Sequence, residues 1–190
     1  MCCCLDASLE KRSLIGLVAG IATAEALSDI GVNRHGLKWP NDIFWGQRKL
    51  GGILIETSNQ SEKLVIGIGL NISLSETTKE RIGQDIVSLD EIMNADKISR
   101  EQLISCLILR LTQQLDTFTA QHFDDFIAIW KSWDILQDKA VSFDHQGETV
   151  SGVVNGLDEF GRLGIVKDNG VLDYFSSADI KLRKNWLEKT

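Results

Sequence analysis

Three short segments between positions 38 and 71 combine charged or polar groups with residues that leave room for a ligand. They are Lys38–Asp42 (Lys-Trp-Pro-Asn-Asp), Arg48–Glu56 (Arg-Lys-Leu-Gly-Gly-Ile-Leu-Ile-Glu) and Gly67–Asn71 (Gly-Ile-Gly-Leu-Asn). A lysine at the end of a strand in a covered sheet is costly unless it meets an anion. Lys38 and Lys49 are therefore candidates to contact a phosphate or a carboxylate.

The second and third segments also carry glycines in positions where a strand is expected. Without side chains, these glycines would let a flat ligand lie against the main chain. The residues concerned are Gly51, Gly52, Gly67 and Gly69. Taken singly, each feature has a plainer explanation: Lys49 as a solvated hairpin residue, Asp42 as a turn residue and the glycines as bulges. Only the three segments together favour a binding site.

Other kinds of chemistry find little support in the sequence. His35, His122 and His145 lie far apart and have no carboxylate or cysteine at ligand spacing, so we predict no metal site. The chain contains neither a Gly-x-Ser-x-Gly elbow nor a glycine-rich Lys-Ser/Thr phosphate loop.

Composition limits the partners of the protein. The 20 Lys+Arg and 27 Asp+Glu residues give a formal charge of −7 without a basic block, which argues against non-specific binding of nucleic acid. No apolar stretch approaches the roughly 20 residues that span a bilayer. The cluster Cys2–Cys4 is expected to be a strand or tail rather than a lipidation site, and with Cys106 it makes no disulfide framework. We therefore expect a cytoplasmic protein that does not associate with membranes.

Helices are predicted in three places by apolar spacing. Leu14–Ser28 reads as a close-packing helix rich in small residues, buried on more than one face. A capping box of Ser99 and Gln102 marks the start of a second helix, whose leucine stripe continues to Leu115. Phe123–Trp133 is the third, and a short helix is expected around 86–93.

Strands are predicted for Leu37–Trp45, Gly51–Thr57 and Leu64–Ile72, the last two as a hairpin. Their nearly continuous apolarity suggests a sheet covered by helices. From Ala140 onward, short β-rich runs alternate with glycine turns, which indicates a small antiparallel barrel. We therefore expect two domains, residues 1–137 and 138–190.

The three segments closely resemble the signature of the biotin–protein ligases, which attach biotin to carrier domains of carboxylases. The resemblance extends over nearly the whole chain. It implies an α+β fold in which a central mixed or antiparallel sheet packs with helices, as in biotin and lipoate ligases, followed by a small SH3-like β-barrel. It also implies a two-step reaction with biotin, ATP and Mg²⁺. Biotin is first converted to biotinyl-5′-AMP and is then transferred to a lysine of a biotin carboxyl carrier protein.

The resemblance also implies roles for individual residues. Lys49 and Lys38 would be the catalytic lysines, with Lys49 on the biotin carboxylate and Lys38 near the phosphates. The biotin ring would be lined by Gly52, Leu54, Gly67 and Ile68. The nucleotide would be bound by Lys38, Asn41, Asp42 and Asn71.

One part of the family pattern does not occur in this sequence. In the family, a Gly-Arg-Gly-Arg-Arg-Gly loop folds over biotin and the adenylate, and Met1–Asp6 resembles the strand that follows it. Without this loop the adenylate should be poorly shielded from water, so we expect weak or no ligation by this chain alone. A non-catalytic module of the same fold and a lipoate–protein ligase remain alternatives. The sequence contains no helix-turn-helix domain for DNA binding and leaves open whether the protein forms a homodimer.

Overall fold

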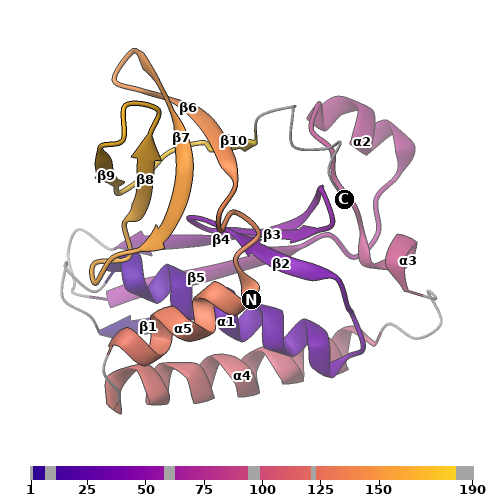
Figure 1. The fold of residues 1–190 in the computed structure, drawn as a ribbon. Helices are drawn as coiled ribbons and strands as arrows, with labels where there is room; N and C mark the ends of the chain where they lie inside the picture. The colour runs from indigo at the N-terminus through magenta and orange to yellow at the C-terminus, as the bar shows by residue number, and fades with distance from the viewer. Residues whose placement is uncertain (1, 7–11, 58–62, 94–98, 121–122, 183–190) are drawn as a thin grey trace.

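The computed structural model describes residues 2–6, 12–57, 63–93, 99–120 and 123–182. Within these ranges the chain forms two antiparallel sheets and five helices (Figure 1). Along the chain the elements are β1 (Cys2–Asp6), α1 (Arg12–Asp29), β2 (His35–Lys38), β3 (Asp42–Trp45), β4 (Arg48–Thr57), β5 (Lys63–Leu70), α2 (Glu76–Ile82), α3 (Leu89–Ile92), α4 (Arg100–Ala120), α5 (Phe123–Trp133), β6 (Ala140–His145), β7 (Glu148–Leu157), β8 (Leu163–Lys167), β9 (Leu172–Phe175) and β10 (Lys181–Leu182).

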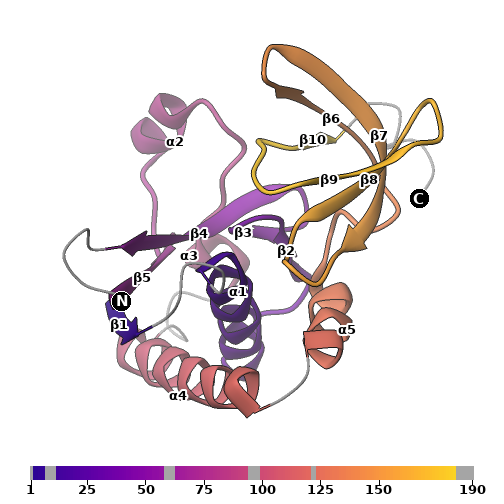
Figure 2. The ribbon, with the colours of Figure 1, turned by 90° about the vertical axis from the view of Figure 1, so that its left-hand side faces the viewer.

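The first sheet has the strand order β1-β5-β4-β3-β2, and every neighbouring pair in it is antiparallel. Helix α1 packs against this sheet, α5 lies beside α1 against β2, and α4 covers α1 on the far side (Figures 1 and 2). The predicted α+β fold is confirmed. The cysteine cluster Cys2–Cys4 lies in β1, as expected for a strand.

Helix α1 shows why its small residues are needed. A Cβ atom added to Gly20 would lie 3.1 Å from the Trp130 ring of α5, and one added to Gly16 would lie 3.6 Å from Ile55 of β4. The helix is therefore in close contact with a second helix and with the sheet at once. This confirms the prediction that it is buried on more than one face.

The prediction that helices cover the sheet holds for one face only. Along β5, the side chains of Leu64, Ile66 and Ile68 are buried, whereas the intervening positions are more exposed. Because successive side chains on a strand point to opposite faces, the second face of the sheet is left open by the helices. The open face was not predicted because its positions in this apolar run include Gly67 and Gly69, which are neither polar nor bulky.

Two other predicted elements differ from the structure. The single strand predicted for 37–45 is two strands, β2 and β3, joined by a turn that contains Pro40. The short helix predicted around 86–93 is limited to α3, and α2 was not predicted. Helix α2 is short and is capped at its N-terminus by Ser75, whose hydroxyl accepts a hydrogen bond from the Thr78 N–H at 3.2 Å.

The second sheet has the order β10-β6-β7-β8-β9 and matches the small antiparallel β-domain expected after residue 137. It rises from the first sheet on the side opposite α4, the same side as α2 (Figures 1 and 2). The domain limits of 1–137 and 138–190 remain a prediction, and residues 183–190 lie outside the described part of the chain. None of the helices described is long and apolar enough to cross a membrane.

Candidate active site

A hollow of about 490 Å³ opens on the helix-free face of the first sheet. Its lining residues come from the β2–β3 turn and from strands β3, β4 and β5. They are Asn41, Asp42, Lys49, Gly52, Ile53, Leu54, Gly67, Ile68 and Gly69. The structure thus brings the three sequence segments to one place.

Strand pairing explains why this part of the sheet is hollow. Gly52 lies opposite Gly69, and Leu54 lies opposite Gly67 in the β4–β5 pair. Three of these four open-face positions have no side chain, and the fourth is Leu54, which is 57% exposed. We call Gly52, Gly67 and Gly69 the glycine floor. Ile68, which we had expected to line the biotin ring, pairs with Ile53 and is only 8% exposed, so it borders the hollow mainly with its backbone.

Lys49 and Asp42 form an ion pair at one end of the glycine floor. The Lys49 Nζ lies 2.6 Å from Asp42 Oδ1, and both side chains are partly buried. A Cβ atom on Gly52 would approach both partners, at 3.4 Å from Asp42 Oδ1 and 3.7 Å from Lys49 Cε. The pair therefore stands directly beside the space that the glycines leave.

The backbone of Lys49 is fixed by the segment that precedes α3. The Lys49 N–H donates to the Asp85 carbonyl at 2.8 Å, and its carbonyl accepts from the Val87 N–H at 3.0 Å. The Asn71 side-chain amide donates to the carbonyls of Lys49, at 3.4 Å, and of Val87, at 3.1 Å. Asn71, predicted to bind nucleotide, thus supports the Lys49 backbone and is not among the residues that line the hollow. Its contact with nucleotide stays a prediction.

Asn41 and Lys38 border the same end of the sheet in different ways. The Asn41 amide donates to the Ile53 carbonyl at 2.8 Å, and the Ile53 N–H donates back to the Asn41 carbonyl at 2.8 Å, so Asn41 ties the β2–β3 turn to β4. Lys38 pairs with Asp42 across β2 and β3 and does not line the hollow itself. Burial lowers the pKa of Lys38, and the neighbouring Lys49 lowers it further, whereas Asp42 and Asp179 raise it.

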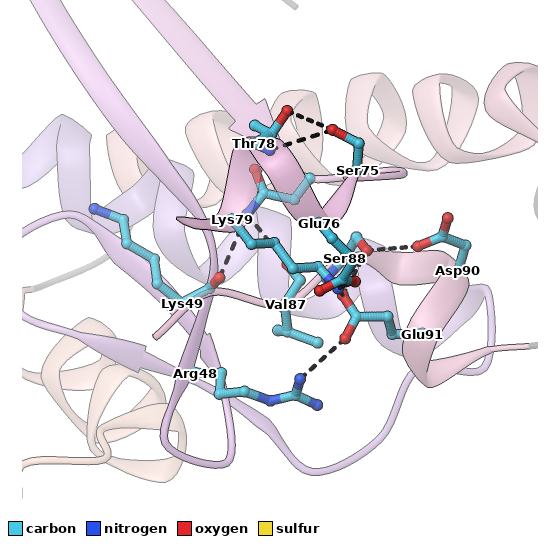
Figure 3. Close-up of polar contacts among 11 residues, drawn as sticks. Arg48, Lys49, Ser75, Glu76, Thr78, Lys79, Val87, Ser88, Asp90 and Glu91 are labelled. Atoms are coloured by element: carbon cyan, nitrogen blue, oxygen red, sulfur yellow. Dashed lines mark hydrogen bonds and ion pairs between the residues drawn. The ribbon is translucent and has the colours of Figure 1, made fainter. Parts of the chain in front are cut away.

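Sequence reasoning missed a polar cluster next to Lys49 that holds α2 and α3 in place (Figure 3). The Glu91 carboxylate accepts from Arg48 at 3.0 Å and pairs with Lys79 at 3.1 Å. It also accepts from the Ser88 N–H at 3.1 Å and from the Ser88 hydroxyl at 2.8 Å. Figure 3 shows the Lys49 side chain extending away from this cluster. The spacing Ser88-x-x-Glu91 is a capping-box pattern and could have predicted the start of α3.

Comparisons with known proteins identify the family of the chain. The profile of the biotin/lipoate A/B protein ligase family matches residues 6–73, and that of the biotin protein ligase C-terminal domain matches residues 138–183. The bifunctional ligase/repressor BirA of Salmonella typhimurium is 30% identical over 172 residues, which cover 89% of this chain and 53% of that protein. The biotin–[acetyl-CoA-carboxylase] ligase of Mycobacterium tuberculosis is 25% identical over 163 residues, or 84% of this chain and 59% of that protein.

Solved structures of the biotin protein ligase from Aquifex aeolicus have a similar fold. One superposes with a TM-score of 0.83 at 28% identity and covers 96% of this chain and 80% of that one. A complex of the same ligase with biotin and ATP gives a TM-score of 0.79 at 26% identity, covering 96% and 76%. The chain spans about half the length of the BirA protein that it matches. Its sequence, its two matched domains and its fold show that the chain belongs to the biotin protein ligase family.

Proposed function

We propose that this protein attaches biotin to a lysine of a biotin carboxyl carrier protein of a carboxylase, by way of biotinyl-5′-AMP. The observation that carries the proposal is the hollow, where a lysine–aspartate pair stands beside a floor of three glycines. A ligand with a carboxylate and a flat apolar body can place the carboxylate at Lys49 and the body over the glycine floor. The complex of the Aquifex relative with biotin and ATP supports this choice of substrates.

The first step joins two anions, and the lysines of the site suit this task. An oxygen of the biotin carboxylate attacks the α-phosphorus of ATP, and pyrophosphate leaves. A fixed cation reduces the repulsion between the reactants and stabilises the charge on the phosphoryl oxygens. We assign this role to Lys49, whose backbone is held by residues 85–87 and whose ammonium lies in the hollow. Lys38, on β2 and separated from β4 by β3, adds a second positive charge.

The second step forms the product amide. The amine of the carrier lysine attacks the acyl carbon of the mixed anhydride, AMP leaves with the shared oxygen, and the new amide nitrogen loses a proton. The M. tuberculosis relative, named for acetyl-CoA carboxylase, supports a carboxylase carrier as the partner.

We propose that Mg²⁺ enters with the triphosphate of ATP. Among the residues that line the hollow, Asp42 supplies the carboxylate, and it is already paired with Lys49. The Asn71 amide nitrogen donates to two backbone carbonyls, and its amide oxygen is a ligand of the kind that Mg²⁺ accepts. This donor set is small, which is typical of an ion held largely by phosphates and water.

The proposal is tested by incubating the protein with biotin, ATP, Mg²⁺ and a carrier domain and weighing the carrier by mass spectrometry. Biotin binding is measured in parallel by calorimetry. We expect a mass gain that depends on ATP, at a low rate because these 190 residues contain no arginine–glycine loop. Lys49→Ala should reduce the rate by about 10²-fold or more. Lys167→Ala, which removes a lysine paired with Asp173 in the second sheet, is the matched control and should change nothing.

Each part of the proposal has its own contrary result. Absence of biotin binding together with absence of carrier modification would contradict the assigned function. Transfer of lipoate in place of biotin would show that the protein is a lipoate–protein ligase. An unchanged rate in Lys49→Ala would remove Lys49 from its role. Rapid biotinylation, comparable to that by a ligase that has the loop, would contradict only the expected weakness.

A further inference from the structure

The indole of Trp39 joins the two halves of the chain beside the candidate active site. Its Nε1–H donates to the carbonyl of Gly161, 122 residues away, at 3.0 Å, and the bond is buried. Trp39 is 2% exposed and begins the turn that carries Asn41 into the hollow. Gly161 lies between β7 and β8, so the second sheet contacts the signature segment itself.

The turn that presents the Gly161 carbonyl is held by a single carboxylate. Asp158 accepts from the N–H groups of Phe160, at 3.0 Å, and Arg162, at 2.8 Å, and from the Arg162 guanidinium at 2.7 Å. The Gly161 N–H in turn donates to the Asp158 carbonyl at 3.0 Å. The direction of the Gly161 carbonyl is therefore set by bonds within the turn.

Two separate observations favour glycine at position 161. Its φ of +72° is strained for any residue with a side chain. A Cβ atom there would also lie 2.9 Å from side-chain atoms of both Leu14 and Leu17 in α1. The turn is thus seated on α1 at one point and bonded to Trp39 at another.

On the other side of Trp39, the chain is tied to the residues of the hollow. Two hydrogen bonds connect Asn41 with Ile53 of β4, and the next residue, Asp42, holds the Lys49 ammonium at 2.6 Å. The segment from Trp39 to Asp42 is therefore fixed at both ends, by the second sheet at Trp39 and by β4 at Asn41 and Asp42. Asp179, in the segment between β9 and β10, raises the pKa of Lys38, the residue next to Trp39.

We propose that Trp39 is a positioning residue, and that the 158–161 turn holds it so that Asp42 keeps the Lys49 ammonium in place over the glycine floor. The second sheet is then part of the machinery that aligns the reacting lysine. The catalytic meaning of this link rests on the proposed function, but the link itself can be tested in the free protein.

The test follows the reactivity of Lys49 toward a limiting amount of an acylating reagent, read residue by residue by mass spectrometry. An ammonium held by a carboxylate reacts slowly, and release of that pair raises the rate. Trp39→Phe and Asp158→Ala should each raise acylation of Lys49 about fivefold relative to Lys167, the factor that corresponds to one lost hydrogen bond between neutral groups. Asn169→Ala is the matched control, since it removes a similar turn contact, to the Val171 N–H, in the neighbouring β8–β9 turn.

The double variant separates positioning from general loosening of the fold. If both changes act through the same bond, Trp39→Phe combined with Asp158→Ala should react no faster than either single variant. Simple multiplication of the two effects, or an unchanged Lys49 rate in Asp158→Ala, would overturn the proposal. A rise that is equal at all lysines would also overturn it, because it would report unfolding. Thermal unfolding curves ensure that all variants are folded at the reaction temperature.

Measuring biotin binding then tests whether the Trp39–Gly161 bond matters for function. With the wild type binding biotin, Asp158→Ala should weaken binding about fivefold and Asn169→Ala should not. Selective Lys49 exposure without any effect on biotin binding would refute the functional part of the proposal. A wild type that shows the reactivity pattern but binds no biotin would refute the proposed function and leave the structural link standing.

Discussion

The glycine floor can be tested by adding single methyl groups to it. Gly67 of β5 and Gly51 of β4 both lie in the β4–β5 pair but differ in what a side chain would meet. A Cβ atom on Gly67 would lie 3.6 Å from the Leu54 carbonyl oxygen and 3.8 Å from Leu54 Cβ, both ordinary contacts. A Cβ atom on Gly51 would lie 2.3 Å from the Gly69 carbonyl oxygen, which is backbone and cannot move aside.

These distances predict opposite changes in stability. Alanine in the interior of a strand is favoured over glycine by about 0.5–1 kcal/mol, so Gly67→Ala should raise the melting temperature by about 1–4 °C in a chain of this size. Gly51→Ala forces a backbone contact apart and should cost about 1–3 kcal/mol or more. Gly67→Val places two further methyl groups over the floor and should weaken biotin binding by at least about tenfold.

The assay is thermal unfolding followed by calorimetric titration with biotin. The expected pattern is that Gly67→Val folds and binds poorly, whereas Gly51→Ala is destabilised but, where folded, keeps its affinity. Gly147→Ala measures the cost of backbone strain without a steric clash, because Gly147 has a positive φ in an exposed turn with nothing within 4 Å of the added Cβ. Full biotin affinity in Gly67→Val would show that the ligand does not lie on the glycine floor and would refute the placement.

Two carboxylates should give the stability a dependence on pH, with opposite signs. Burial raises the pKa of the Asp134 carboxyl to about 6. Below pH 4 the group therefore does not lower the free energy of unfolding, and this free energy falls as the pH rises from there through 6. Asp134→Asn should match the wild type near pH 4 and exceed its unfolding free energy at pH 8 by up to about 3 kcal/mol, measured by urea unfolding. Burial also acts to raise the pKa of Glu91, but hydrogen bonds from Ser88, Lys79 and Arg48 outweigh it and lower the pKa to about 2. The wild type should therefore lose stability as the pH falls from 4.5 to 2, and Glu91→Gln, unfolded in urea over the same range, should lose less.

Local patterns predicted most helices and strands. The Ser99 hydroxyl accepts from the Gln102 N–H at 3.2 Å, so the start of α4 was correctly placed by its capping pattern. Its stripe of leucines is buried through Leu111, and Trp130 of α5 is in the core. Such features follow from residues a few positions apart, which is why one sequence suffices to find them.

The contacts that shape the site depend on separations that no local pattern encodes. The bond from Trp39 to Gly161 joins a turn of the first sheet to a turn of the second sheet, 122 residues away. The roles of the signature residues were inferred from a family resemblance, whereas the bond from Asn71, just after β5, to the Lys49 carbonyl was not foreseen. The one-sided exposure of the first sheet also escaped prediction. In an apolar run, a glycine looks the same whether its face is covered or open.

The ion pair of Lys49 with Asp42 explains how a charged lysine side chain can be stable in the hollow when no ligand is bound. An unpaired ammonium that is partly buried would lose hydration without compensation. The Asp42 carboxylate, at 2.6 Å, compensates for that loss. An ammonium has three N–H donors, and Asp42 needs one, so a ligand carboxylate can be added to the pair without displacing Asp42. The incoming anion must still approach Asp42, whose negative charge opposes it. Lys38, paired across the strands with Asp42, offsets that charge. An ammonium alone would accept any small anion. Selectivity among carboxylates must therefore come from the shape of the space above Gly52, Gly67 and Gly69.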